Sequence, residues 1–385
     1  MQGLWLLLLP VAATCGWFSG RYTKIIDKSP QPSDLRKDYF AGLNYVLNEQ
    51  PDKAVDVFIR LLKVDSDTVE THLALGNLFR RKGEVDRAIR IHQNLMARTQ
   101  LDPLHRLAAL SALAQDYLKA GMLDRAERLF LELSIDKNYQ VQSLEYLMKI
   151  YQQEREWTKA IEVARQLRLV TKVPVTVMIA QYYCELAEKD LKNRKFEEAE
   201  SYLKEALNEN PQCVRATLIR ARLAEQVEDY ASAIRHYQKV ELQNPIFMSE
   251  TILPLMKSYQ KINDHEAMFL YFKESLQRHP QLAASLAGST FFQTQITTGI
   301  PLQQISELFT KQPSLSALNC LLNIYNESSR DQSHYELLKK VVAKLMADKN
   351  TYCCSQCGLS GKMLHWQCPG CQQWDKIEPL KGIKG

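Results

Sequence analysis

The pattern of hydrophobic and polar positions divides the 385-residue chain into three parts. Residues 1–20 carry no charged side chain and include an apolar run from Leu4 to Leu9, so no face of a helix there is polar. From Asp34 onward, apolar residues recur at the spacing of amphipathic helices almost without interruption. The last thirty-odd residues lose this period and hold five of the nine cysteines. The sequence therefore predicts an apolar leader, a long helical body and a small separate tail.

The leader, residues 1–20, is predicted to be a transmembrane helix. Twenty helical residues span about 30 Å, the thickness of a hydrocarbon core. Trp5 and Trp17 lie near its two ends, where interfacial aromatic residues are common. Two alternatives, a lipoprotein leader cleaved before Cys15 and a buried soluble helix, are disfavoured because no basic residue precedes the run and no polar face exists. The first basic residues all follow the segment, which places the body in the cytoplasm: Arg21, Lys24 and Lys28.

The helical body contains an internal repeat. Its marker alanines are separated by 34, 38, 34, 39, 34 and 34 residues, which is the period of the tetratricopeptide repeat, a stacking pair of helices. Small residues stand twelve positions before most of these alanines, where the two helices of a unit approach each other closely. The two longer gaps place extra residues at Leu101–Leu104 and near Thr171–Pro174, where we expect a longer helix end or loop. The marker positions are Ala54, Ala88, Ala126, Ala160, Ala199, Ala233 and Ala267.

These patterns predict a domain order. The transmembrane anchor, residues 1–20, is followed by a linker with two prolines over residues 21–33. About seven repeat units occupy residues 34–280, and degenerate repeats with a closing helix occupy 281–349, because terminal repeats are usually atypical. Residues 350–385 form a metal-binding domain. The predicted fold is therefore all-α: a tetratricopeptide-repeat superhelix with an N-terminal transmembrane helix and a small C-terminal rubredoxin-like knuckle domain that holds a metal with four cysteines.

Polar residues of the first helices define a candidate partner groove. Stacked units form a concave face lined by first helices, and positions three and four apart on one helix share a face. A groove for an extended peptide or a helix is one interpretation, and ordinary solvated positions are the other. Further positions on this face include Ser111, Glu145, Gln152, Gln181, Glu188, Arg215 and Glu225. The candidate groove residues are Asn77, Arg80, Gln115, Lys149 and Arg222.

The tail contains two Cys-x-x-Cys pairs separated by ten residues, Cys354 with Cys357 and Cys368 with Cys371. Such pairs place four thiolates around one soft metal ion, and a chain this short needs a structural metal to fold. We expect Gly358, directly after the first pair, to adopt a positive φ in its turn. A disulfide-linked or free-thiol tail is the alternative, which a reducing compartment, indicated by the odd number of cysteines, disfavours.

Composition narrows the function classes. The formal net charge of +5 comes from 49 basic and 44 acidic residues, and no basic stripe is interleaved with aromatic residues, which argues against nucleic acid as a partner. The sequence contains no Walker-type phosphate loop, no dinucleotide-binding glycine motif, no His-Glu-x-x-His and no Gly-x-Ser-x-Gly. We therefore predict that the protein is not an enzyme.

The tail and the whole chain resemble known families. The two cysteine pairs, with Trp374 three residues after the second, are similar to the knuckles of a rubredoxin, although only ten residues intervene and most of the rubredoxin core is missing. Cys353 departs from the motif, which leaves an alternative coordination open. The order of short anchor, repeats and truncated rubredoxin tail resembles the lipopolysaccharide assembly protein B family of Gram-negative bacteria over essentially the full chain.

The resemblance implies a location, a role and a cofactor. Family members sit in the inner membrane, facing the cytoplasm, with the tail packed onto the repeats and iron or zinc as the metal. They promote degradation of the lipid A-committing deacetylase by a membrane-bound AAA+ protease, and gather lipopolysaccharide enzymes at the membrane.

Two functions are weighed. The first is a membrane adaptor that holds a client and a protease. The alternative is a redox or metal-sensing module, with one iron held by four cysteines, acting on a bound partner. A periplasmic scaffold is a third, minor interpretation.

Overall fold

The structure, a computed structural model, describes residues 69–99, 101–171, 175–280 and 349–380, with single positions elsewhere in the chain. It divides into two compact units, residues 1–150 and residues 151–385. In the part that is described, no helix is both long and apolar enough to cross a bilayer. The predicted anchor, linker and closing segment lie outside the described residues, apart from those single positions.

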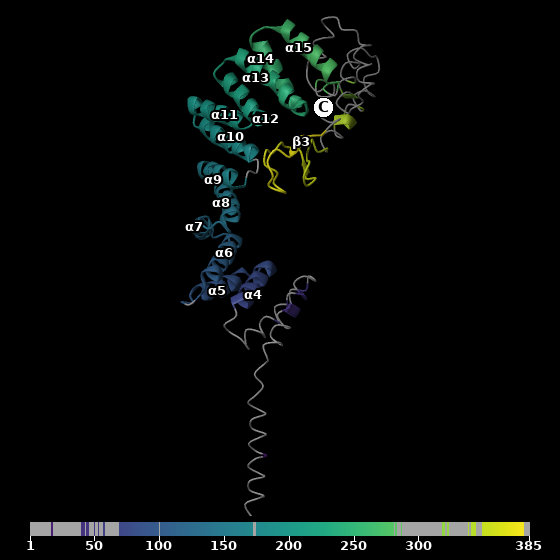
Figure 1. Cartoon of the computed structure of the whole chain (residues 1–385). Helices are drawn as coiled ribbons and strands as arrows, with labels where there is room; N and C mark the ends of the chain where they lie inside the picture. Colours follow the sequence, from purple (N-terminus) through teal and green to yellow (C-terminus); the bar gives the residue numbers. More distant parts are fainter. Residues whose placement is uncertain are drawn as a thin grey trace, which may run out of the picture. The chain divides into compact units, whose positions relative to one another are not determined.

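Antiparallel helix pairs build the described part of the first unit (Figure 1). Each pair contains a first and a second helix, and α8 extends across the boundary between the two units. Apolar side chains at helical spacing fill the interface within each pair, including Leu75, Leu95 and Phe130. The helices are α4 (Val69–Lys82), α5 (Val85–Met96), α6 (Pro103–Lys119), α7 (Leu123–Leu133) and α8 (Gln140–Glu154).

The second unit continues the same pairing and adds the tail. Its core includes Tyr237, Leu255 and Phe272, contributed by successive helices. A short 3-10 helix, η2 (Pro245–Phe247), joins α13 to α14. The helices are α9 (Trp157–Thr171), α10 (Thr176–Lys192), α11 (Phe196–Glu209), α12 (Val214–Gln226), α13 (Tyr230–Gln243), α14 (Met248–Lys261) and α15 (His265–Arg278).

The marker alanines confirm the repeat prediction. Five of them are fully buried, because only a methyl group fits where the second helix of a unit faces the first. The small residues predicted on the first helices, Ala114, Ala187 and Ala221, are fully buried as well. Ala267 is only partly buried, and Ala54 lies outside the described residues. The fully buried markers are Ala88, Ala126, Ala160, Ala199 and Ala233.

A left-handed residue ends the first helix of each described pair, and it turns the chain toward the second helix. Gly83 and Gly121 fill this position with φ values of 85° and 75°. A residue with a side chain accepts the same conformation elsewhere, at a steric cost that glycine avoids. These residues are Arg155 (φ 59°), Arg194 (φ 58°), Glu228 (φ 61°) and Asn263 (φ 56°).

The two long gaps between marker alanines lengthen helices. α6 and α10 each contain 17 residues, whereas α4 and α14 contain 14. α6 begins inside the stretch where extra residues were expected: the Asp102 carboxylate accepts a hydrogen bond from the N–H of Leu104, and Pro103 occupies the first turn. The first helix that follows each long gap is therefore longer than α4 and α14.

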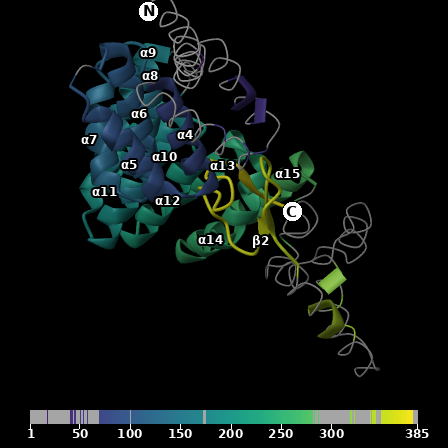
Figure 2. The ribbon, with the colours of Figure 1, turned by 90° about the horizontal axis from the view of Figure 1, so that it is seen from below.

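The tail forms a small antiparallel sheet, which the sequence did not predict. β1 (Tyr352–Cys354) lies between β2 (Ser360–Gly361) and β3 (Ile377–Pro379). Tyr352 pairs with Gly361 on one side and with Pro379 on the other. β3 lies against η2, and both ribbon views place the tail beside the helices of the second unit (Figure 2). The all-α repeat fold with a rubredoxin-like knuckle domain is confirmed, with this sheet as its β component.

Candidate metal centre and its dock on the repeats

The two cysteine pairs fold into turns of the same geometry. In the first, the N–H of Gly358 donates to the carbonyl of Cys354 at 2.9 Å; in the second, the N–H of Gln372 donates to the carbonyl of Cys368 at 2.8 Å. Gly358 adopts the expected positive φ of 75°, and Gln372 takes the same conformation at 57°. Gln372 has a side chain, so this conformation costs free energy in the second turn. Gly358 avoids that cost in the first turn.

These turns bring the four predicted ligands together. The Sγ atoms of Cys354, Cys357, Cys368 and Cys371 all lie within 4.8 Å of one another. The Sγ atoms of Cys354 and Cys371 are 3.7 Å apart, and those of Cys357 and Cys368 are 3.6 Å apart. Four sulfurs at about 2.3 Å from one ion in a tetrahedron lie about 3.8 Å apart, so the spacing fits a single Zn²⁺ or an iron ion of similar size.

Electrostatics favours a cation among these sulfurs. Although desolvation opposes it, backbone N–H groups of Cys357 and Gln356 lower the pKa of the Cys354 thiol to about 7. The pKa of Cys357 is raised to about 11: the N–H of Leu359 lowers it, but desolvation and the neighbouring thiols outweigh that effect. One thiolate thus forms readily, and each further one is opposed until a cation compensates its charge.

Cys353 stands outside this cluster. Side chains alternate across a strand, so Cys353 on β1 faces away from Tyr352 and Cys354, which are both buried. Its thiol lies 3.8 Å from the carbonyl of Cys354 and 3.7 Å from the carbonyl of Gly358. The alternative coordination that the sequence left open has no geometric support, and the described cysteines are not joined in disulfides.

Trp374, three residues after the second pair, docks the tail on the repeats. Its indole is 6 % exposed and packs edge-on against Tyr182 and Trp157, at centroid distances of 6.0 and 6.3 Å. The guanidinium of Arg215 lies 5.9 Å from the indole centroid. The indole N–H donates to Oε1 of Gln152 at 3.2 Å. A residue of the rubredoxin motif therefore fills an aromatic slot formed by α9 and α10.

A buried polar chain continues from Trp374. Oδ1 of Asp375 accepts from Nε2 of Gln181 at 2.7 Å, and Oε1 of Gln181 accepts from Nη1 of Arg215 at 3.1 Å. Arg215 also pairs with Glu185 at 2.7 Å. Burial raises the pKa of Asp375, and the Gln181 hydrogen bond and the charge of Arg215 only partly offset this effect. The carboxylate is therefore held by specific donors in a site that disfavours its charge.

Two further contacts fix the other side of the tail. The hydroxyl of Tyr352 donates to Oε1 of Glu250 on α14 at 2.8 Å. Trp366 stacks on Phe247 of η2 with a centroid distance of 5.5 Å. Because these contacts and the Trp374 contacts involve residues that flank the cysteines, the ligand turns and the dock are built by the same short stretches of chain.

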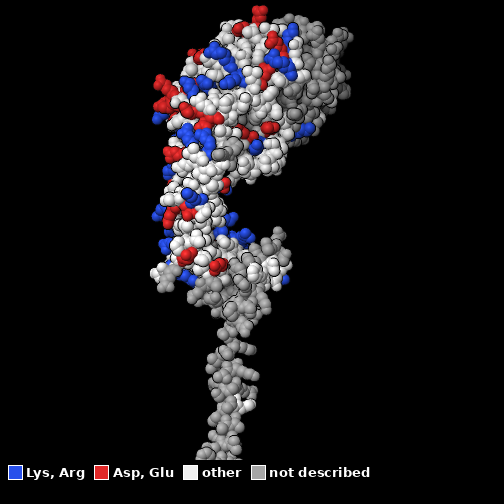
Figure 3. Space-filling view, in the orientation of Figure 1, with Lys and Arg blue, Asp and Glu red and all other residues white. Residues whose placement is uncertain are grey.

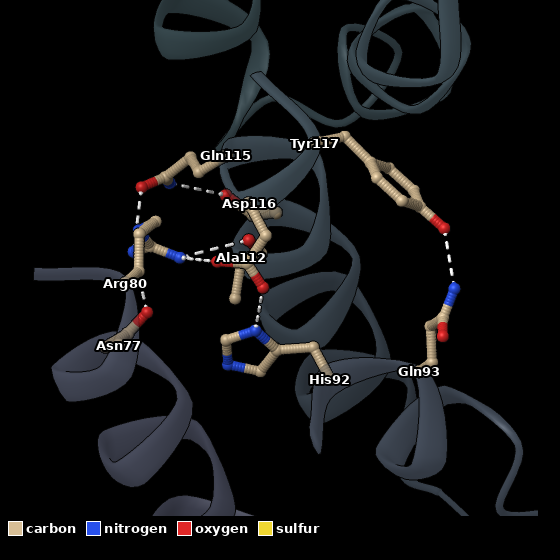
Figure 4. Close-up of polar contacts among 9 residues, drawn as sticks. Asn77, Arg80, His92, Gln93, Ala112, Gln115, Asp116 and Tyr117 are labelled. Carbon is tan, nitrogen blue, oxygen red and sulfur yellow. Dashed lines mark hydrogen bonds and ion pairs between the residues drawn. The ribbon is translucent and has the colours of Figure 1, made fainter. Parts of the chain in front are cut away.

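Three of the predicted groove residues meet in the first unit (Figure 4). Nη2 of Arg80 donates to Oδ1 of Asn77 at 2.7 Å and to Oε1 of Gln115 at 3.1 Å. Nη1 of Arg80 pairs with Oδ1 of Asp116 at 2.7 Å. The second oxygen of Asp116 lies 2.5 Å from Nδ1 of His92, and both side chains are fully buried.

The other two predicted groove residues have different neighbours. Lys149 is exposed, with its ammonium 5.2 Å from the ring centroid of Tyr146 on the same helix. Arg222, in the second unit, is 57 % exposed and lies 3.7 Å from a carboxylate oxygen of Glu188. The role of both residues as partner contacts stays a prediction.

Sequence reasoning missed the buried polar partners. Asp116 and His92 occupy positions that helical periodicity assigns to the core, and Asp375 was not singled out at all. A charged residue in an apolar stripe was the available signal for Asp116, because buried carboxylates require partners. Nothing local in the sequence indicated that Asp375 would meet Gln181, 194 positions away.

The molecular surface agrees with the mixed composition. On the face seen in Figure 3, basic and acidic side chains alternate over the described helices rather than separating into single-sign fields. Charged side chains of the described helices also pair with one another, such as Arg168 with Glu209 at 2.8 Å and Arg220 with Glu200 at 2.5 Å. This face gives no electrostatic indication of nucleic-acid binding.

Comparisons with known proteins agree with both parts of the fold. Tetratricopeptide repeat models match residues 71–107 and 184–245, and a rubredoxin metal binding domain model matches residues 352–379. A solved tetratricopeptide-repeat protein from Cytophaga hutchinsonii is 16 % identical, covering 63 % of this chain and 95 % of its own, with a TM-score of 0.41.

Two curated relatives cover the chain from end to end. Lipopolysaccharide assembly protein B of Escherichia coli K12 is 34 % identical over 388 residues, covering all of both chains. The protein of the same name from Haemophilus influenzae is 33 % identical over 391 residues, covering 99 % of this chain and 98 % of its own. By this full-length similarity, and by the repeats and cysteine knuckles described above, the chain belongs to the lipopolysaccharide assembly protein B family.

Proposed function

We propose that the protein is an inner-membrane adaptor that regulates lipopolysaccharide synthesis. It holds the lipid A-committing deacetylase for proteolysis by the membrane-bound AAA+ protease, and it gathers other lipopolysaccharide enzymes at the membrane. The observation that carries the proposal is the full-length similarity to lipopolysaccharide assembly protein B, in a chain built of repeats that present polar first-helix surfaces.

Proximity is a sufficient mechanism for this role. Anchoring by residues 1–20 would keep the repeats at the cytoplasmic side of the membrane, where a membrane-bound protease works. Tethering two partners on one scaffold raises their effective concentration to about the millimolar range without any bond-making step by the scaffold. The protein's own residues then need only bind and orient.

The lifetime of the deacetylase tests the adaptor proposal. Cells that lack the protein should degrade the deacetylase more slowly after protein synthesis is stopped than cells that contain it. Re-expression of the full chain should restore the fast decay, whereas re-expression of residues 34–385 without the anchor should not. An unchanged lifetime in the deletion strain would contradict the proposal.

The cluster of four cysteines favours a second candidate, redox or metal sensing by an iron centre. Four Sγ atoms within 4.8 Å of one another can bind iron as well as zinc, and the family resemblance implies one or the other metal. Purified iron protein should be red and should bleach reversibly on reduction, whereas a zinc form is colourless. Metal analysis of the purified protein separates the two, and a colourless zinc protein would remove the redox candidate.

A further inference from the structure

Two cysteines outside the metal centre meet between consecutive repeats of the second unit. Cys184 lies on α10, and Cys213 is the N-cap residue of α12. Their Sγ atoms are 3.9 Å apart, and both side chains are fully buried. A disulfide holds its sulfurs about 2.05 Å apart, so closing this pair brings the two sulfurs about 2 Å nearer to each other. The two thiols are therefore a candidate site for a disulfide.

The surroundings of the pair are polar, unlike those of a cysteine that only fills an apolar core. Nε2 of Gln181 lies 3.7 Å from Sγ of Cys213, and Oε1 of Gln181 accepts from Nη1 of Arg215 at 3.1 Å. Gln181 and Arg215 are both buried. Among the described residues, Nε of Arg215 has no hydrogen-bond partner. A buried cation with an unused donor in the same cluster favours a thiolate once one forms.

Burial keeps the pair unreactive while the cluster is closed. It raises the pKa of the Cys184 thiol well above its ordinary value, and the neighbouring thiol of Cys213 adds to this effect. The charge of Arg215 lowers the pKa of Cys184 but does not compensate. Because the thiolate is the nucleophile, both sulfurs are protected until water enters and the cost of desolvation falls.

The docked tail covers the residues that adjoin the pair. The amide nitrogen of Gln181 that contacts Cys213 also donates to Oδ1 of Asp375 in the tail, at 2.7 Å. The indole of Trp374 lies against Arg215, with 5.9 Å between the guanidinium and the ring centroid. When the tail leaves, Gln181 and Arg215 lose these partners and water reaches the cluster. Access to the two sulfurs is therefore coupled to docking.

We propose that Cys184 and Cys213 are a peroxide-sensitive modification site, which forms a reversible disulfide when the tail leaves the repeats and is protected while the tail is docked. The inference goes beyond the adaptor function and does not depend on which metal the tail holds. In a reducing compartment the pair rests as two thiols, so the disulfide marks protein that lost its dock while peroxide was present.

The oxidation needs hydrogen peroxide and no further reactant. One thiolate attacks an oxygen of the peroxide and the O–O bond breaks, which gives a sulfenic acid and a hydroxide that takes up the released proton as water. The second sulfur attacks the sulfenic sulfur, the S–S bond forms, and the hydroxyl group leaves with the second thiol's proton as water. Two thiols and one peroxide thus give one disulfide and two waters, and the sulfurs lose two electrons. Low-molecular-weight thiols reverse the reaction by exchange and become a disulfide themselves.

Peroxide treatment of the full-length protein in detergent tests the proposal. Samples are alkylated at intervals and digested, and mass spectrometry identifies the peptides that are joined. We expect a Cys184–Cys213 disulfide that forms about tenfold faster in Trp374→Ala than in wild type, the ratio that one unit of thiol pKa produces. Dithiothreitol should restore both thiols. Met363→Ala, at an exposed position of the tail, is the matched control and should react at the wild-type rate.

The outcomes decide the proposal. Equal rates in wild type and Trp374→Ala overturn it, as does the absence of this disulfide from both proteins. A disulfide that instead joins Cys184 or Cys213 to a cysteine of the tail also overturns it. Faster formation in Trp374→Ala alone, with the metal content unchanged at the times compared, supports it.

A second variant covers the case in which Trp374→Ala loses its metal or fails to fold. Asp375→Ala removes only the tail's acceptor for Gln181 and leaves the cysteine turns and the indole in place. It should also speed the formation of the disulfide, and a rate equal to wild type would refute the coupling to docking. In Cys213→Ala, Cys184 should form no disulfide, and a disulfide at Cys184 in that variant would show that Cys213 is not its partner.

Discussion

The first helices of the two units use their polar side chains in different ways. In the first unit, Arg80 binds side chains of its own and the next repeat, 3 to 36 residues away. In the second unit, Gln152 and Gln181 bind the tail, 222 and 194 residues away from their partners Trp374 and Asp375. Arg80 and Gln152 each stand eight residues before a marker alanine, yet Arg80 serves a local network and Gln152 a long-range dock.

This difference indicates which contacts the stability of each unit depends on. In the first unit, Arg80 and Nδ1 of His92 are paired with Asp116 from the unit's own helices, so its stability should not depend on the metal. The second unit places Trp157 and Tyr182 under Trp374, and the tail that covers them is too small to fold without its cysteine centre. Metal binding should therefore stabilise the second unit and leave the first unchanged.

Loss of a ligand should have the largest effect. Cys371→Ser leaves three thiolates, and structural metal binding contributes about 10 kcal/mol or more in small cysteine-rich domains. We expect loss of the metal, unfolding of the tail and faster hydrogen exchange in α10 and α14, while α4 keeps its protection. Cys353→Ser is the matched control and should retain the metal. Equal exchange in both units would break the comparison.

Removal of the docking indole should come next. Trp374→Ala deletes a buried aromatic side chain and one of the two donors to Oε1 of Gln152, at a cost of about 3 kcal/mol. We expect the tail to keep its metal but to be cleaved faster by a protease. Leu359→Ala, at a position that is 41 % exposed, is the control and should be cleaved at the wild-type rate. Resistance equal to wild type would show that the dock is not held by Trp374.

A methyl group at Gly76 should affect only the first unit. Gly76→Ala places a Cβ against the His92 ring, and overpacking of this kind costs about 1–3 kcal/mol. Calorimetry should show a lower melting temperature for the first unit and an unchanged one for the second. Gly361→Ala adds the same methyl group where no atom lies within 4 Å, and it should be neutral. A shift in both units would indicate that they unfold together.

The smallest effect concerns the charge of Asp375. Burial raises the pKa of Asp375 in the docked state. The contribution of this carboxyl group to the free energy of docking is therefore greatest below the ordinary pKa of aspartate, and it is lost as the pH rises through the raised pKa. Asp375→Asn keeps an acceptor for Gln181 without a charge, so docking at pH 7 should be unchanged or tighter by less than about 1 kcal/mol. Tail protection measured from pH 5 to 8 should differ between variant and wild type only above the raised pKa. Weaker docking of the variant at pH 7 would contradict this sign.

Much of the fold and of the metal site could be predicted because their signals are local. The 34-residue period placed Ala88 and Ala199 in the core, and two Cys-x-x-Cys pairs indicated the ligands before any geometry was known. The prediction for Arg80 was incomplete for a physical reason. Periodicity gives the face on which a residue lies, but not whether its donors are already occupied by Asp116 and Ala112.

The sequence by itself determined the helix pairs, their phase and the four clustered thiols, because these depend on residues within one repeat or one turn. Only the tertiary structure decided where the tail docks and which polar groups are already hydrogen-bonded within the protein. Trp374 finds its slot, and Asp375 finds Gln181, through contacts between distant segments. Buried polar groups must be paired, and the partner is chosen by whichever surface the folded chain brings within hydrogen-bond distance.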